Sequence, residues 1–153
     1  MIALTDQLAA LGLTLPQPLA PLASYLPARR AGDLLYLSGH VSRADGTVVA
    51  GVVGDDIDPA TAAILARAVA LDLLASAAAA LGSVDNIAGV LRITGFVRSA
   101  PGFGGQPGVI NGASDLFVDL FGERGRHARS AIGVGELPLG AAVEIEAIFE
   151  IAG

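Results

Sequence analysis

The sequence predicts an α+β fold in which two helices cover one face of a mixed sheet. Three observations indicate it: a long alanine-rich segment bounded by helix caps, several short runs of β-branched and large apolar residues, and a chain order that places each helix between strands. The other face of such a sheet also needs a cover. We expect self-association of the chain to supply it.

The composition indicates one folded domain. A chain of 153 residues fits a single domain, and 53% hydrophobic against 16% charged residues excludes a disordered chain. This is more apolar surface than a small monomer can bury, so we expect interfaces between copies.

Charge and residue types exclude several functions. The net charge is -6 and the chain has no Lys, which excludes a Schiff-base lysine and a phosphate loop that needs Lys. An acidic chain without a basic cluster is a poor candidate for nucleic-acid binding. There is no Cys, and His40 and His127 lie far apart, so we expect no bound metal.

The N-terminal residues predict a cytoplasmic protein, because no basic region precedes the first apolar residues. Thr5 or Asp6 is expected to cap a short helix that ends near Gly12. Residues 13–27 contain four prolines and are expected to form an extended arm.

The first predicted strand is residues 33–41. Residues 43–46 form a turn, since Asp45-Gly46 is a strong hairpin signal, and residues 47–53 are expected to be the returning strand.

A long helix should begin at Asp58-Pro59 and end at Gly82, because Asp caps the free N–H groups and Pro suits the first helical position. Apolar residues lie on two arcs of this helix, so it should be covered on two sides. Although apolar, it contains Arg67 and Asp72 and is mostly Ala, which favours a buried helix over a membrane span.

The remaining segments complete the layer. We expect strands at 87–97, 127–134 and 142–151, a mobile loop at 99–108, and a second helix at 109–121.

Acidic residues mark the last strand. Strand alternation places Glu144, Glu146 and Glu150 on one face, opposite a row of apolar residues. They are either solvated acids on a half-exposed strand, or one of them is an acid/base or water-orienting group.

Spacing alone does not decide between a structural and a functional role for the other candidate residues. Arg129 is a surface arginine, a partner of a strand glutamate, or an anchor for a substrate carboxylate. Ser38-Gly39-His40 is a plain strand exit or a place where a ligand approaches the backbone closely. His40 is an acid/base candidate at neutral pH, but a lone His is more often structural. Tyr25, in the arm, is more often a packing residue.

These residues occur together in one known arrangement. The chain resembles the RidA/YjgF family, also called endoribonuclease L-PSP, over roughly residues 22–151. The similarity is carried by LYLSG at 35–39, Asn111, ARSA at 128–131, and the closing LP and VEIEAI at 137–138 and 143–148. Residues 21–153 are therefore expected to form the family domain, with residues 1–20 as an N-terminal extension.

The resemblance implies a chorismate-mutase-like fold and a homotrimer whose sheets form an inner barrel, with clefts between subunits. It implies hydrolysis of reactive 2-imino acids, in equilibrium with enamines, to 2-keto acids and ammonia, without a cofactor.

Matched by position, Arg129 corresponds to the family arginine that binds the substrate carboxylate, and Glu144 to the glutamate that holds the attacking water. The resemblance implies that the remaining matched residues line the cleft: Tyr25, Ser38, Gly39, His40 and Asn111.

The chain departs from the family pattern, as a divergent member. His40 stands where active deaminases often have Gln, and Ala131 where many have Cys. A non-catalytic trimer that binds a small carboxylate is the alternative function, and Arg129 would serve it equally. RNA cleavage is a third function, against which the acidic charge argues.

Overall fold

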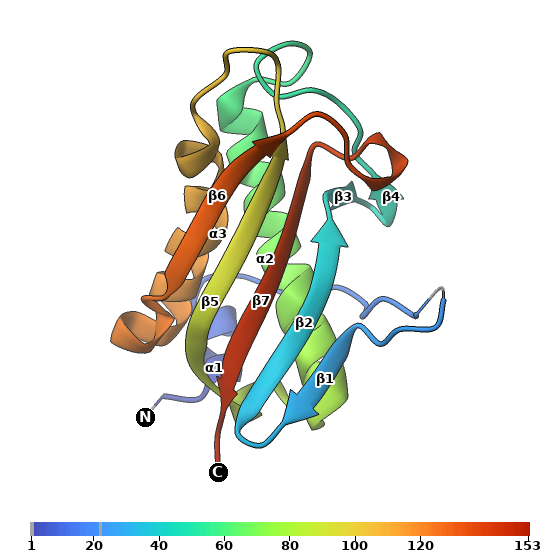
Figure 1. The fold of residues 1–153 in the computed structure, drawn as a ribbon. Helices are drawn as coiled ribbons and strands as arrows, with labels where there is room; N and C mark the ends of the chain where they lie inside the picture. Colours follow the sequence, from blue (N-terminus) through green and yellow to red (C-terminus); the bar gives the residue numbers. More distant parts are fainter. Residues whose placement is uncertain (1, 22) are drawn as a thin grey trace.

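The computed structural model describes residues 2–21 and 23–153, and it has the predicted α+β architecture. One five-stranded sheet has the order β1-β2-β7-β5-β6, and the helices α2 and α3 lie together on one of its faces (Figure 1). Strands β5 and β6 are parallel and the other neighbours antiparallel, so the sheet is mixed. The bounds are β1 Ala28–Ala31, β2 Leu34–Val41, β5 Ile87–Arg98, β6 Ala128–Val134, β7 Val143–Ile151, α1 Leu4–Ala10, α2 Pro59–Leu81 and α3 Gln106–Phe121.

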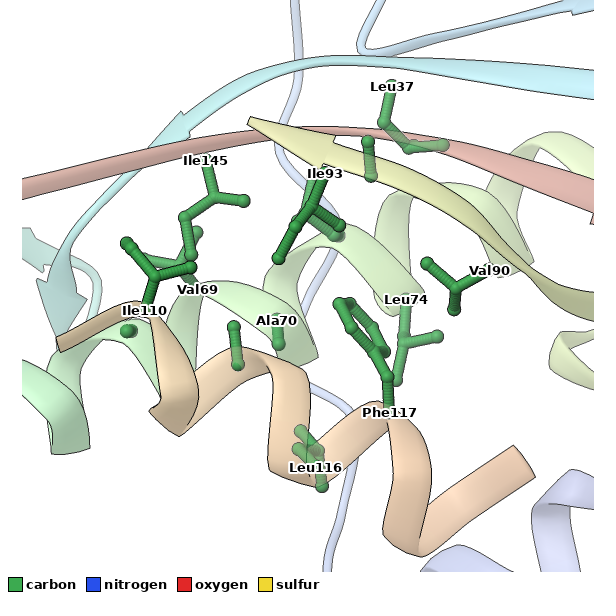
Figure 2. Close-up of a cluster of buried hydrophobic side chains, with 14 of the residues drawn as sticks. Leu37, Val69, Ala70, Leu74, Val90, Ile93, Ile110, Leu116, Phe117 and Ile145 are labelled. Atoms are coloured by element: carbon green, nitrogen blue, oxygen red, sulfur yellow. The ribbon is translucent and has the colours of Figure 1, made fainter. Parts of the chain in front are cut away.

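The core lies between the sheet and the two long helices. In Figure 2, side chains from the strands point toward α2 and α3, and side chains from the helices fill the space between them. Burial of this apolar surface is the main force that holds the layers together. The side chains labelled there are Leu37, Val69, Ala70, Leu74, Val90, Ile93, Ile110, Leu116, Phe117 and Ile145.

Helix α2 has the bounds that its caps predict. The Asp58 carboxylate accepts a hydrogen bond from the Thr61 N–H at 2.8 Å, and Gly82 ends the helix with φ of 82°. Among the described helices, α2 is long and apolar enough to cross a membrane by length and composition alone. Its many buried residues pack against the sheet and α3, which accounts for its apolar character.

Two expectations near the first hairpin were wrong. Asp45-Gly46 does turn the chain, but the returning strand β4 is only Thr47–Val48, paired with β3 (Arg43–Ala44) in a separate small sheet. Strand β2 pairs instead with β7 and with β1, a strand that was not predicted. Helix α3 also begins earlier than expected, at Gln106 rather than residue 109.

The N-terminal segment packs onto the domain. Leu4 and Leu8 of α1 are buried, and Thr5 donates two hydrogen bonds to the Asp85 carboxylate, at 2.8 and 2.9 Å. Residues 13–21 have no helix or strand, as the prolines predict. Met1 and Leu22 lie outside the described residues.

Candidate functional site

A cavity of about 340 Å³ brings five of the seven predicted site residues together. It lies where the arm, the end of β2 and the start of β7 meet. The five residues are Tyr25, Ser38, Gly39, His40 and Glu144, and the other lining residues are Leu19, Ala20, Pro27, Val41, Arg43, Pro138 and Leu139.

A β-bulge shapes the wall of this cavity. Leu37 pairs with Ala147 and His40 with Ile145, so β2 has an extra residue between these pairs. Strict alternation would place Leu37 and His40 on opposite faces, yet both are buried. The bulge therefore leaves Gly39 beside Glu144 while His40 turns toward α2.

His40 is a buried, fully bonded side chain. Its Nδ1 lies 2.6 Å from the Ser38 carbonyl oxygen and its Nε2 lies 2.7 Å from the Ser76 Oγ of α2. Burial is the main reason that the pKa of His40 falls below its ordinary value, and the Arg43 charge adds to it. Both ring nitrogens are engaged, so this geometry suits a role in fixing the bulge rather than contact with a substrate.

Glu144 is the acidic group of the cavity. It lies between the buried residues Val143 and Ile145, so its side chain lies on the sheet face away from the helices. Partial burial, and next the negative charge of Glu146, raise the pKa of Glu144. A β-carbon on residue 39 would collide with the Glu144 carboxylate. Because residue 39 is glycine, the carboxylate can occupy this place.

Arg129 lies in a second cluster, at the edge strand β6. Its Nη1 donates to Asn111 Oδ1 at 2.8 Å and to Ser114 Oγ at 3.1 Å, and its Nη2 donates to the Pro107 carbonyl at 3.3 Å. These three acceptors follow one side of α3 at positions i, i+4 and i+7. Arg129 and Asn111, two of the predicted site residues, are thus in direct contact.

The charge of Arg129 is not neutralised within the described part of the chain. All three acceptors are uncharged oxygens, and no described carboxylate forms a salt bridge with it. Among the described residues, these three hydrogen bonds leave the Nε–H and one Nη2–H of the guanidinium without an acceptor. Two parallel donors of this kind match the two oxygens of a carboxylate.

One chain does not bring the two clusters together. Arg129 is paired with Ile93, whose side chain is buried against the helices, whereas Glu144 lies on the opposite sheet face. Strand β5 also separates β6 from β7. Arg129 and Glu144 can therefore act on one ligand only if a second copy supplies one of them.

Residue patterns missed several members of both clusters. Arg43 and Leu139 line the cavity, and Ser114 and His127 join the hydrogen bonds around Arg129. Ser114 had a usable signal, because it lies three residues after Asn111 on the same helix face. Among the described residues, no group of three or more His, Asp or Glu side chains is placed to hold a metal ion.

A family model, a relative and crystal structures are similar to this chain. The model of the family described as Endoribonuclease L-PSP matches residues 16–151. Protein TCP17 of Trypanosoma cruzi is 41% identical over 143 residues, which are 92% of this chain and 89% of that protein.

Two crystal structures resemble it over almost its full length. Protein Atu1372 of Agrobacterium tumefaciens, described as of unknown function, is 44% identical, with a TM-score of 0.89 over 97% of this chain and 92% of the other. A putative endoribonuclease from Shewanella oneidensis is 28% identical, with a TM-score of 0.92 over 98% and 100%. The fold, the match over most of the chain and these relatives agree: the chain belongs to the endoribonuclease L-PSP family, also called RidA/YjgF.

Proposed function

We propose that the protein hydrolyses reactive 2-imino acids, and the enamines in equilibrium with them, to 2-keto acids and ammonia. The observation that carries this proposal is the guanidinium of Arg129, held by neutral oxygens and left with two adjacent free donors. A fixed, unneutralised cation of this shape is suited to a small carboxylate.

Arg129 would orient the substrate. With the carboxylate bound to the Nε–H and Nη2–H edge, the imine carbon next to it has one position and one orientation. Holding a reactant in this way supplies a large part of a catalytic advantage.

Glu144 would hold and activate water. Its carboxylate accepts a proton as the water oxygen bonds to the imine carbon, and the π electrons of C=N move to nitrogen. That proton then passes to the nitrogen, which gives a carbinolamine. Glu144 next takes the hydroxyl proton and delivers it to the nitrogen as the C–N bond breaks, so ammonia leaves while the C=O bond forms. The raised pKa brings Glu144 closer to neutral pH, where an acid/base group works best.

The site requires neighbouring subunits, and we propose a homotrimer as the assembly. Tyr36 and Ile132, both 45% exposed, lie on the sheet face that no helix covers. Covering this face with other copies would bury them and place one copy's Arg129 beside another's Glu144 cavity. We propose a cytoplasmic location, no cofactor, and no nucleic-acid or membrane partner.

The alternative is a non-catalytic trimer that binds a small carboxylate. Arg129 and Asn111 favour binding of this kind whether or not Glu144 acts on water. The family description raises RNA cleavage as well, but a net charge of -6 without any Lys disfavours contact with phosphates.

An ammonia-release assay tests the proposal. The imine is generated in place by an amino-acid oxidase, and wild type is compared with Arg129→Ala and Glu144→Ala. We expect wild type to accelerate release and both variants to lose most of the acceleration. If wild type does not accelerate ammonia release over buffer, the enzymatic function is rejected. If a 2-keto acid nevertheless stabilises the folded protein, the result supports the non-catalytic binding function. Equal rates in all three proteins reject the site.

A further inference from the structure

His127 precedes β6 and has a defined protonation pattern. Its Nδ1 lies 2.6 Å from the Gly125 carbonyl oxygen, which can only accept, so the proton is on Nδ1. The ring packs edge-to-face on Phe117, with centroids 5.9 Å apart. Burial, reinforced by the Arg129 charge, lowers the pKa of His127 below its ordinary value. The neutral ring therefore offers Nε2 as an acceptor.

Ser114 connects this ring to Arg129. Its Oγ lies 2.9 Å from His127 Nε2 and 3.1 Å from Arg129 Nη1. Because Nε2 accepts, the serine hydroxyl donates its proton to the ring. The oxygen lone pairs are then free to accept from the guanidinium, which has no acceptor capacity of its own.

Every hydrogen bond in this chain of groups therefore has one direction. Arg129 donates to Ser114, Ser114 donates to His127, and His127 donates to the Gly125 carbonyl. A serine without a fixed acceptor can rotate its proton toward Nη1, which would weaken the bond to the guanidinium. The His127 tautomer prevents that rotation.

We propose that Ser114 and His127 are positioning residues for Arg129, and that they hold its free Nε–H and Nη2–H edge ready for a substrate carboxylate. This inference rests on the proposed function for the identity of the ligand. Neither residue touches the reacting atoms, and both act through the orientation of Arg129.

Four variants in two matched pairs test it. Ser114→Ala and His127→Phe remove the connection, whereas Ser114→Thr keeps the hydroxyl and His127→Gln supplies an amide oxygen as acceptor. We expect the loss of one hydrogen bond that orients Arg129 to lower kcat/KM about tenfold, mainly through a higher KM. We expect the conservative variants to recover most of the affinity. An unchanged KM in both disrupting variants, once they are shown to be folded, overturns the proposal.

Nitrogen NMR separates this inference from the proposed function. In ¹⁵N-labelled wild type, His127 should show a protonated Nδ1 and an unprotonated Nε2 at neutral pH. The Arg129 side-chain signals should shift and broaden in Ser114→Ala and His127→Phe, but not in their conservative partners. If wild type neither turns over imines nor binds 2-keto acids while these signals respond, the function fails and the positioning stands. If wild type is active but the signals do not respond, the positioning fails.

Discussion

The two faces of the sheet carry two different kinds of site. On the open face, a bulge and an arm form a cavity around Glu144, whose carboxylate has space because residue 39 is glycine. On the helix face, at the edge strand, Arg129 is fixed by oxygens of α3 and lies open on one side. The first provides a cavity with an acid and the second provides a cation. In the proposed function each cluster supplies one half of the site, and their separation on one chain is the reason that we propose a site shared between copies.

Subunit complementation tests whether the two clusters act together, and it has the largest expected effect. Arg129→Ala and Glu144→Ala should each be inactive alone, because each lacks one half at every site. In mixed trimers from equal co-expression, random assembly leaves about one quarter of the interfaces with both halves intact. Ammonia release should therefore recover to about one quarter of the wild-type rate.

Two controls are needed. One is each variant assayed alone, and the other is a mixture of the two variants that were assembled separately and do not exchange subunits. Absence of recovery in verified mixed assemblies contradicts a site shared between subunits.

The sequence predicted the bounds of the helices and strands better than which strands pair with one another. Local chemistry sets the ends of α2, where Asp58 and Gly82 act within one turn, and both were predicted correctly. The pairing of β2 with β7 joins segments about a hundred residues apart, which no local pattern encodes. Strand β1 was missed because ARRA has no apolar run.

The site was predictable only in part, for the same reason. Alternation correctly placed Glu144 on the face away from the core. Alternation does not account for the burial of His40, because a single extra residue in β2 reverses the face of the residues that follow it. The spacing from Asn111 could have indicated Ser114, but not its contact with Arg129, because that contact depends on how α3 packs on the sheet.

Gly39→Ala tests the position of the Glu144 carboxylate in the cavity. The added β-carbon would collide with the Glu144 carboxylate and displace it, leaving the Arg129 half intact. We expect kcat to fall about 10- to 100-fold, with the affinity for a 2-keto acid nearly unchanged. Steady-state kinetics and calorimetry of 2-keto acid binding measure the two effects.

Gly104→Ala is the matched control, because nothing lies within 4 Å of a β-carbon there. A Gly39 variant with wild-type kcat would argue against a role for the Glu144 position.

Gly112→Ala tests the packing behind the Arg129 half. A β-carbon on this residue of α3 would overlap the Ala63 carbonyl of α2, so the two helices would have to separate. We expect a loss of about 1–3 kcal/mol in the free energy of unfolding, measured by urea denaturation.

Gly108→Ala on the same helix meets nothing within 4 Å and should stabilise the protein slightly, because alanine favours helix. Equal effects of the two substitutions would show that the α2–α3 contact is not close.

Asp72→Asn probes the contact between the arm and α2, next to the cavity half, and has the smallest expected effect. Asp72 lines a hollow together with Pro16 and Leu19 of the arm. Burial raises the pKa of Asp72 from 3.8 to about 6, although the Arg43 charge opposes the rise. The folded state then binds a proton that the unfolded state releases, so stability falls as pH rises from about 4 to 6. After allowance for partial exposure, Asp72→Asn should gain about 1–2 kcal/mol at pH 7 and nothing near pH 4. Urea denaturation at both pH values measures this, and an equal gain at both would assign the effect to something other than ionisation.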